Sequence, residues 1–224
     1  RILPWRVSPS EQSRGIKADP SRIWLSEIML PQTTVEAAKS YFTKFVERWP
    51  DVMAMAAASE DDILRAWAGL GYYSRARNLK KCADLVAAQY AGSFPTTAAE
   101  LKELPGIGDY TSAAIAAIAF GQPAAVVDGN VERVISRLYA IDTPLPAAKT
   151  EIRLLMGELT PADRPGDFAQ AVMDLGATIC TPRRPACAIC PVNDGCEALT
   201  KRDPEEFPVK APKASKPIRT GAAF

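Results

Sequence analysis

The sequence contains no histidine among its 224 residues. Mechanisms that need an imidazole base, and zinc sites of the Cys2His2 type, are therefore excluded. Acid–base chemistry must come from carboxylate, Lys, Tyr or Cys side chains. An excess of one charge is also lacking, because 27 Lys and Arg against 26 Asp and Glu leave a net charge of +1. Any binding of nucleic acid must then depend on local basic patches, not on a field of the whole molecule.

Long apolar runs are missing as well. The longest, from Thr111 to Phe120, is rich in Ala and much shorter than the roughly 20 residues that cross a bilayer, so it favours a buried helix. The first residues, RILPWRVSPS, lack the apolar segment of a signal peptide. They also lack Met, and we expect further residues ahead of them. These features indicate a soluble intracellular protein that has no contact with a membrane.

Alternating patterns typical of β-strands are absent, and apolar residues recur instead at helical spacing. Asp19 followed by Pro20 is typical of a helix start, and we expect a helix through the run SRIWLSEIML. Further helices are expected over roughly 74–90 and from near 129, 149 and 167. The sequence therefore predicts an all-α protein with short loops.

Four of the five cysteines are concentrated in one short segment. Cys180, Cys187, Cys190 and Cys196 have the spacing C-x6-C-x2-C-x5-C. So dense a group rarely forms disulfides inside a cell, whereas four thiolates on one loop can surround a tetrahedral zinc ion or a [4Fe–4S] cluster. Zinc ribbons usually carry two separated CxxC pairs and only one is present, which favours iron and sulfur. Cys82 lies in an expected helix and is interpreted as a core residue.

The loop between the first two of these cysteines carries Arg183 and Arg184 at its tip. If a metal centre fixes both ends of the loop, the two guanidinium groups are held rigidly and can contact phosphates. The alternative is that they are ordinary solvated surface charges.

A second motif lies at 104–108, where the sequence reads LPGIG between two expected helices. Gly106 and Gly108 permit a tight turn with exposed backbone N–H groups at the start of the second helix, near Tyr110. Such donors form an anion site that suits a DNA phosphate and reads no base. Any helical hairpin can use Gly and Pro, so the pentapeptide from Leu104 is by itself a moderate indication of DNA binding. Together with the cysteine loop that follows, it is a strong one.

Together, LPGIG, the run VDGNVERV at 127–134 and the 6-2-5 cysteine spacing resemble the endonuclease III superfamily of helix-hairpin-helix DNA glycosylases. The resemblance covers nearly all of residues 1–202. It implies one [4Fe–4S] cluster held by the four cysteines, and two all-helical lobes with a DNA-binding cleft between them.

The resemblance also implies a division of the chain. Residues 19–124 are expected to form a six-helix barrel that carries the hairpin, and residues 1–18 and 125–203 to form the iron–sulfur lobe. Pro, Lys and Ala dominate from Pro204 onward, which predicts an extended linker over 204–224, although a disordered tail would have the same composition. The end of this segment, KPIRTGAAF, resembles the start of a C-terminal MutT-like domain that recognises 8-oxoguanine, so the chain is interpreted as truncated.

Two positions bear on the reaction. The resemblance implies that Asp128 is the catalytic aspartate, which stabilises positive charge at C1′ of a flipped nucleotide. By itself an Asp before Gly-Asn is more often a helix cap, and it can serve as both. Tyr110 stands where the bifunctional lyases have the lysine that forms a Schiff base, which implies a monofunctional enzyme. Its phenol can donate a hydrogen bond to Asp128.

A third position, Glu27 in WLSEIMLPQTTV, resembles the general acid of the MutY family of adenine DNA glycosylases. Apolar neighbours would raise its pKa and let it act as an acid near neutral pH. The alternative is that Glu27 lies on the wet face of an amphipathic helix.

The same resemblance implies further site residues. Gln32 and Tyr72 match residues that wedge into the duplex, and Pro31 stands where family members often have Gln. Asn130 matches an active-site amide. Trp5 and Arg6 match a segment near the adenine pocket, and Gln170 matches a residue that reads the adenine edge.

The implied reaction is hydrolysis of the N-glycosidic bond of adenine mispaired with 8-oxoguanine or guanine in double-stranded DNA, after base flipping. The implied protein is a monomer of the bacterial cytoplasm, associated with the nucleoid. Two alternatives remain open at this point. One is a mismatch thymine glycosylase of the same superfamily, which can also have Tyr at position 110. The other is an iron–sulfur protein that binds DNA or senses redox state without catalysis.

Overall fold

The computed structural model describes residues 2–212. Within this range the regular elements are α-helices and short 3-10 helices, with one isolated β-bridge between Leu145 and Lys210. No helix of the described chain is long and apolar enough to span a membrane. The helices are α1 (Pro9–Gln12), α2 (Pro20–Met29), α3 (Val35–Arg48), α4 (Val52–Ala57), α5 (Glu60–Trp67), α6 (Ser74–Tyr90), α7 (Ala98–Lys102), α8 (Asp109–Phe120), α9 (Gly129–Leu138), α10 (Lys149–Leu159), α11 (Pro165–Thr178) and α12 (Glu197–Lys201), with 3-10 turns η1 (Cys187–Ile189), η2 (Asn193–Gly195) and η3 (Pro204–Glu206).

Local signals in the sequence explain where several helices begin. Asp19 caps α2 by accepting hydrogen bonds from the backbone N–H groups of Ser21 and Arg22, and Pro20 occupies the first helical position. Thr97 and Glu100 form a reciprocal capping box at the start of α7. The helix predicted from Asp19 is therefore confirmed.

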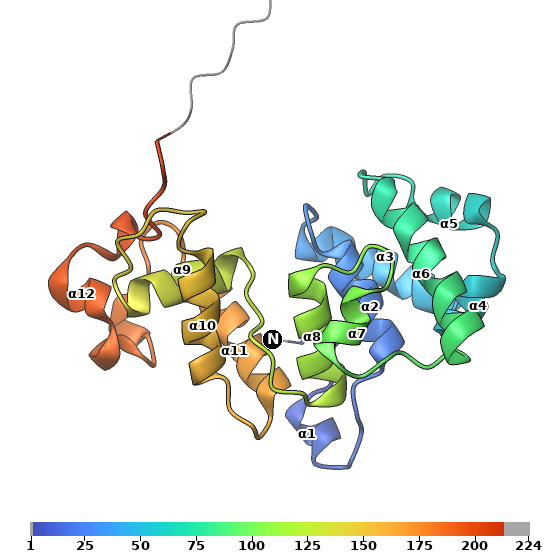
Figure 1. Ribbon diagram of the computed structural model, residues 1–224, viewed down its shortest axis with the longest axis horizontal. Coiled ribbons are helices and arrows are strands. Elements are labelled where there is room, and N and C mark those ends of the chain that lie inside the picture. Colours follow the sequence, from blue (N-terminus) through green and yellow to red (C-terminus); the bar gives the residue numbers. More distant parts are fainter. Residues whose placement is uncertain (1, 213–224) are drawn as a thin grey trace, which may run out of the picture.

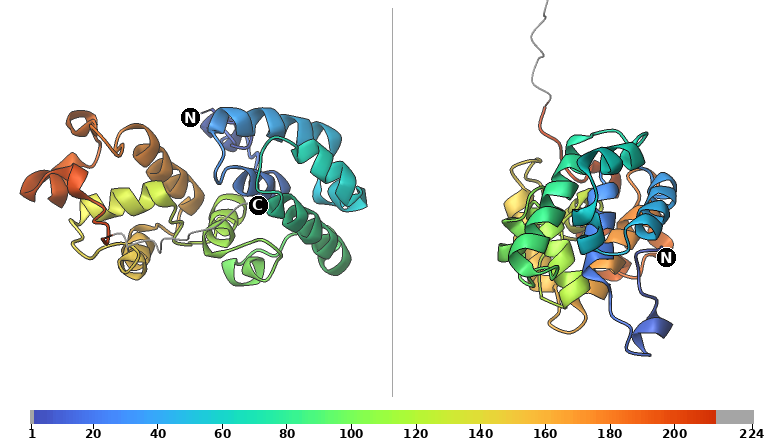
Figure 2. Two further views of the ribbon diagram at one scale, coloured as in Figure 1. Left: turned by 90° about the horizontal axis from the view of Figure 1, so that it is seen from above. Right: turned by 90° about the vertical axis from the view of Figure 1, so that its right-hand side faces the viewer.

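The hydrophobic side chains form two main cores, which correspond to the two groups of helices in Figures 1 and 2. The larger lies among α2 to α8 and contains fully buried Trp24, Phe45 and Trp67. The smaller joins α9 and α10 around Val131 and Ile152, which are both 0% exposed. Cys82 is also 0% exposed in α6, as expected for a core residue.

A third, alanine-rich core connects the two groups of helices through α8 and α11. The helices approach closely because Gly166 has no side chain: a Cβ there would lie 2.6 Å from the carbonyl oxygen of Ala117. The Ala-rich run predicted to be a buried helix is the greater part of α8, and Ala114 and Ala117 are almost fully buried in it. The seam between the lobes is thus made of small side chains.

Both ends of the described chain pack differently from expectation. The N-terminal segment, expected with the iron–sulfur lobe, contacts both lobes: the Trp5 ring packs edge-on against Phe42 of α3, while Arg6 pairs with Asp174 of α11. At the other end, the expected linker begins as a packed segment. Phe207 is 2% exposed. Burial of this one aromatic side chain anchors the start of a stretch that is otherwise rich in Pro and Lys. Of the expected linker and domain start, residues 213–224 lie outside the described residues.

Candidate active site and iron–sulfur loop

A cavity of about 270 Å³ lies at the seam between the lobes. It is lined by side chains from the N-terminal segment and from α2, α8, α9 and α11, which are far apart in the sequence. Seven of the residues singled out from the sequence line it: Trp5, Arg6, Glu27, Tyr110, Asp128, Asn130 and Gln170.

Glu27 is the most unusual of these residues, because it is a carboxylate that is only 4% exposed. It lies near the end of α2, between the buried side chains of Ser26 and Ile28, and not on a wet helix face. Burial raises its pKa to about 7, the hydrogen bond from Tyr110 opposes this rise, and the nearby negative charge of Asp128 adds to it. A substantial fraction of Glu27 is therefore protonated near neutral pH.

Tyr110 is the second residue of α8, and its hydroxyl donates a hydrogen bond to Glu27 Oε2 at 2.7 Å. The expected partner, Asp128, does not receive it. Burial, followed by the adjacent Glu27 carboxylate, raises the pKa of the phenol well above its usual value. Tyr110 therefore stays a neutral donor and orients one oxygen of Glu27.

Asp128 is the N-cap of α9. Its Oδ1 accepts from the backbone N–H groups of Asn130 at 2.9 Å and Val131 at 2.8 Å, and its Oδ2 accepts from the Asn130 side-chain amide at 3.0 Å. The residue is thus a helix cap, as its sequence context suggests, and also lines the cavity.

The rest of the cavity wall combines aromatic, amide and charged groups. Arg6 forms a two-pronged pair with Asp174, with donor–acceptor distances of 2.6 and 3.1 Å. The side-chain amide of Gln170 donates to the carbonyl of Gly166 at 3.2 Å, in its own helix. Trp5 supplies a ring that is 6% exposed and supported by Phe42. The cavity therefore offers a flat apolar surface beside hydrogen-bonding groups.

The hairpin at 104–108 connects α7 to α8 as expected. Gly106 has a φ of 77°, and a Cβ there would lie 2.6 Å from Cβ of Asn78, so the turn requires glycine. Gly108 is the N-cap of α8 and provides no side-chain cap, which leaves the first turn of the helix to be satisfied from outside. Leu104 is only 2% exposed, so its side chain belongs to the core and anchors the start of the hairpin.

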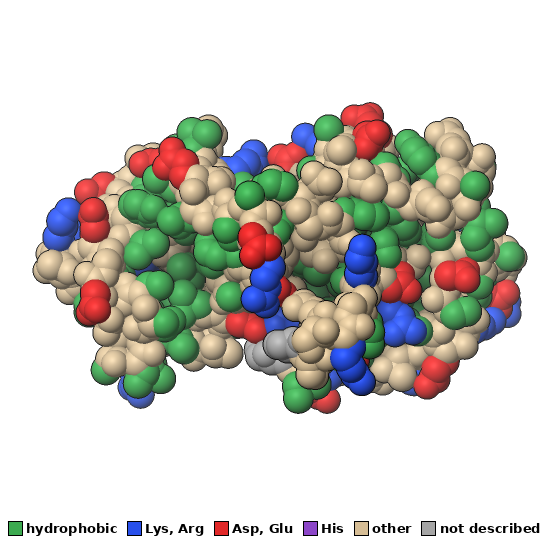
Figure 3. Space-filling model, turned by 90° about the horizontal axis from the view of Figure 1, so that it is seen from below, with side chains coloured by type: hydrophobic (Ala, Val, Ile, Leu, Met, Phe, Trp, Pro, Cys, Tyr) green, Lys and Arg blue, Asp and Glu red, His purple; other side chains and the backbone are tan. Residues whose placement is uncertain are grey.

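The remaining candidate DNA contacts do not line the cavity. Gln32 and Tyr72 are exposed on the loops that follow α2 and α5, and both have left-handed backbone conformations, with φ of 59° and 48°. Arg183 and Arg184 are exposed at the tip of the cysteine loop. On the face shown in Figure 3, basic and acidic side chains are interspersed, in keeping with the small net charge.

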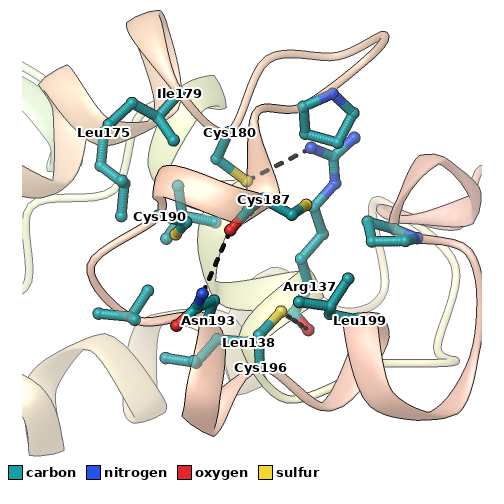
Figure 4. A pocket seen from close by; sticks show the side chains of 14 residues that line it. Arg137, Leu138, Leu175, Ile179, Cys180, Cys187, Cys190, Asn193, Cys196 and Leu199 are labelled. Atoms are coloured by element: carbon teal, nitrogen blue, oxygen red, sulfur yellow. Dashed lines mark hydrogen bonds between the residues drawn. The ribbon is translucent and has the colours of Figure 1, made fainter.

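The four cysteines of the 180–196 loop line one small apolar pocket in the lobe of α9 to α12 (Figure 4). All four are free thiols, and Arg137 Nη1 donates to the Cys180 sulfur at 3.3 Å. Among the described residues, no three His, Cys, Asp or Glu side chains lie close enough together to hold a single ion. Four free thiols around one apolar pocket are a donor set that fits an iron–sulfur group.

Comparison with known proteins decides the family. The model of the HhH-GPD superfamily of base excision DNA repair proteins matches residues 25–161, more than half of the chain. The chain belongs to this superfamily. The model of the iron–sulfur binding domain of endonuclease III matches residues 180–196, which are the residues of the cysteine loop, so the loop is an iron–sulfur binding segment.

Relatives and solved structures of the superfamily extend the likeness to most of the chain. It is 43% identical to the human adenine DNA glycosylase over 92% of its own length and 38% of that protein, and 37% identical to an adenine DNA glycosylase of Buchnera aphidicola over 96% of its own length and 59% of that protein. It therefore spans between about a third and two thirds of the length of these relatives. A thermostable thymine-DNA glycosylase structure is 32% identical, covers 90% of this chain and 89% of its own, and has a TM-score of 0.78. An endonuclease III–DNA complex has a TM-score of 0.70 at 24% identity and shares the fold. The prediction of an all-α fold of endonuclease III type is confirmed.

Three residues of this superfamily member were missed from the sequence. Asp174 accepts hydrogen bonds from Arg6. It lies one helical turn after Gln170 in α11, and this spacing could have indicated that both face the cavity. Arg133 follows Asn130 by three residues and donates to its side-chain oxygen at 3.0 Å, and it also donates to the backbone oxygen of Cys180 at 2.7 Å. Arg75 contacts two loops that are distant in sequence, and no local pattern indicates this role.

Proposed function

We propose that this chain is the catalytic region of a monofunctional adenine DNA glycosylase, which hydrolyses the N-glycosidic bond of adenine paired with 8-oxoguanine or guanine. The observation that carries the proposal is a buried carboxylate, Glu27, with a pKa of about 7, in the same cavity as the charged cap Asp128. Two carboxylates in unlike surroundings can divide the work of acid catalysis and charge stabilisation. The identity to curated adenine DNA glycosylases supports the choice of base.

Glu27 acts as the general acid. Its proton passes to a ring nitrogen of the flipped adenine, so that the electron pair of the breaking C1′–N bond leaves on a neutral base. Water then adds to C1′ and returns a proton to the Glu27 carboxylate, which restores the starting state. The hydrogen bond from Tyr110 to Oε2 fixes the orientation of the carboxyl group through both steps.

Asp128 stabilises the positive charge that develops on the sugar as the base departs. Its two oxygens are held by three hydrogen bonds at the start of α9, so no reorganisation is needed when the charge appears. Tyr110 has no amine that could form an imine with C1′. Water is then the nucleophile that attacks C1′, which supports hydrolysis without strand cleavage.

Residues other than Glu27 and Asp128 bind the DNA and the flipped base. The adenine lies in the cavity, against Trp5 and beside polar groups of Arg6 and Gln170, with Asn130 holding the catalytic cap. The duplex is held by phosphate contacts from the hairpin backbone at Gly106 and Gly108 and from Arg183 and Arg184, and Gln32 and Tyr72 wedge into it.

The cysteine loop would hold one [4Fe–4S] cluster through Cys180, Cys187, Cys190 and Cys196, and the bound cluster would fix the loop without taking part in the reaction. We further propose a six-helix barrel lobe over 19–124, a cluster lobe formed by 1–18 and 125–203, and, over 204–224, a linker and the start of an 8-oxoguanine-recognition domain. We propose that the enzyme acts as a monomer in the bacterial cytoplasm, where it associates with the nucleoid.

A single-turnover excision assay with duplexes that contain A:8-oxoguanine, A:G, T:G or A:T tests the proposal. We expect excision from the first two duplexes only. Asp128→Asn should lose at least roughly 100-fold in rate, because it removes the charge beside C1′. Asn is as good an N-cap as Asp, so α9 should keep its start and duplex binding should persist.

The same assay separates the alternatives. Faster excision from T:G than from A:8-oxoguanine would support a mismatch thymine glycosylase, which the similarity to the thymine-DNA glycosylase structure makes the second candidate. Binding to all duplexes without excision would support a non-catalytic iron–sulfur protein.

A further inference from the structure

Two surface loops carry the residues proposed to enter the duplex, and the first of them reaches the cavity through Leu30 and Thr33. The loop 30–34 joins α2 to α3 and carries Gln32, and the loop 68–73 joins α5 to α6 and carries Tyr72. Both residues have a left-handed backbone conformation, which residues other than glycine adopt at a cost. Such a conformation persists only where the surrounding structure enforces it.

Arg75, in the first turn of α6, contacts both loops with one guanidinium group. Its Nη1 donates to the carbonyl of Pro31 at 2.6 Å and to those of Ile28 and Met29 at 3.0 Å, just before that loop. Its Nη2 donates to Thr33 Oγ1 at 3.4 Å.

The same group also holds the second loop. Nη2 donates to the carbonyl of Leu70 at 3.3 Å, and the guanidinium lies 5.5 Å from the centre of the Tyr72 ring and 5.3 Å from that of Trp67. A planar fork with several fixed donors can do this, whereas the single ammonium of a lysine cannot reach all of these acceptors at once.

The position of Arg75 is not one that helix stability favours. A cation in the first turn opposes the helix dipole. Among the described residues no carboxylate lies within ion-pair distance of it, so its charge is balanced by carbonyl oxygens and ring faces of the two loops. Arg77, two residues later, is exposed and lies 3.8 Å from Glu60, as is usual for a surface arginine.

We propose that Arg75 is a positioning residue that locks the loops 30–34 and 68–73 together, so that Gln32 and Tyr72 enter the duplex as one rigid wedge. The proposal rests on the proposed glycosylase function. Arg75 itself does not line the catalytic cavity, so it acts on unstacking of the base and not on the chemical step.

The test compares Arg75→Gln with Arg77→Gln, a matched loss of one arginine from the same helix. Each protein is mixed with an A:8-oxoguanine duplex that carries 2-aminopurine beside the target adenine, and the rise in fluorescence on binding reports unstacking. We expect Arg75→Gln to lose most of the rise and roughly 100-fold in single-turnover excision rate, because the wedge is misplaced. Arg75→Lys should fall between Arg75→Gln and the unchanged protein, and Arg77→Gln should match the unchanged protein.

Glu27→Gln separates this proposal from the proposed function, since it should keep the fluorescence rise while losing excision. A full rise in Arg75→Gln would overturn the positioning role. Absence of both signals from the unchanged protein would instead overturn the glycosylase function. If Arg75→Gln does not fold, hydrogen exchange of Arg75→Lys decides: faster exchange in both loops supports the proposal, and faster exchange confined to α6 contradicts it.

Discussion

At the scale of single residues, the chemistry that the cavity can perform depends on the burial and the hydrogen bonds of its carboxyl groups. Burial raises the pKa of Glu27 to about 7, whereas Asp128, which lines the same cavity, accepts three hydrogen bonds at the start of α9. Tyr110 connects the first of them to α8. These contacts lead to two predictions.

Replacing Glu27 by Gln should abolish the chemistry and stabilise the fold at high pH. The pKa of Glu27 is about 7 in the folded chain against an ordinary value of 4.5, so the folded state binds the proton more tightly than the unfolded chain does. Stability is therefore full below pH 4.5 and is lost as the pH rises through about 7, by about 3 kcal/mol. Thermal melts should show a gain in Tm for Glu27→Gln that is larger at pH 8 than at pH 4.5. The exposed Glu36→Gln is the control, and an equal difference at both pH values would contradict the buried acid.

Tyr110→Phe should shift the alkaline limb of the pH–rate profile for excision to higher pH. As a general acid, Glu27 is active when protonated, so the rate should fall as the pH rises through about 7. The hydrogen bond from the phenol lowers this pKa, and its loss should raise it. Single-turnover rates between pH 5 and 9 check the shift. A limb that stays in place would mean that Tyr110 does not act on Glu27.

At the scale of helices and loops, the local signals were readable from the sequence and the distant contacts were not. The cap at Asp19, the glycine turn at Gly106 and the Ala-rich α8 all follow from neighbouring residues. The partner of Tyr110 and the burial of Phe207 depend on how separate helices pack, and no sequence spacing encodes that. The side chain of Leu104 is likewise buried in the larger core, a contact that the hairpin motif alone does not indicate.

Helix packing also gives a pair of glycine substitutions with opposite expected signs. A Cβ on Gly176 in α11 would lie 2.7 Å from Cβ and 2.9 Å from the carbonyl oxygen of Asn130, so Gly176→Ala must push α9 away. We expect a loss of roughly 1–3 kcal/mol in stability and slower excision, since Asn130 holds Asp128. Gly157→Ala in α10 meets only Ala125 at 3.9 Å and should gain about 0.5–1 kcal/mol. Urea unfolding of both variants measures the difference, and a stable, active Gly176→Ala would show that the α9–α11 contact is not tight.

At the scale of the whole molecule, the cavity lies where two separately packed lobes meet. Glu27 comes from α2 in the larger group of helices, Tyr110 packs against the alanine-rich core at the seam, and Asp128 caps α9, the first helix of the smaller group. The N-terminal segment crosses between the groups through Trp5 and Arg6. The distances across the cavity therefore depend on the relative position of the lobes. The cysteine side chains lie outside this cavity, beyond α9 and α11 (Figure 1), and the loop connects to it through Arg133, which donates to the backbone oxygen of Cys180 and to Asn130. We therefore expect the loop to act mainly through binding of DNA.

Loss of the metal centre should therefore weaken DNA binding before it affects chemistry. Cys187→Ser removes one of the four thiolates that line the apolar pocket and should release the loop that carries Arg183 and Arg184. The purified protein should be brown, with absorbance near roughly 400 nm and iron on metal analysis, and the variant should lose both. Its affinity for duplex should fall and become less dependent on salt, because fewer phosphates are contacted, while the excision rate at saturating enzyme changes less. Cys82→Ala removes a thiol from the larger hydrophobic core and should keep the iron, which makes it the matched control. Zinc without iron in the unchanged protein would contradict the cluster, and unchanged duplex affinity in an iron-free variant would show that the loop arginines do not bind phosphate.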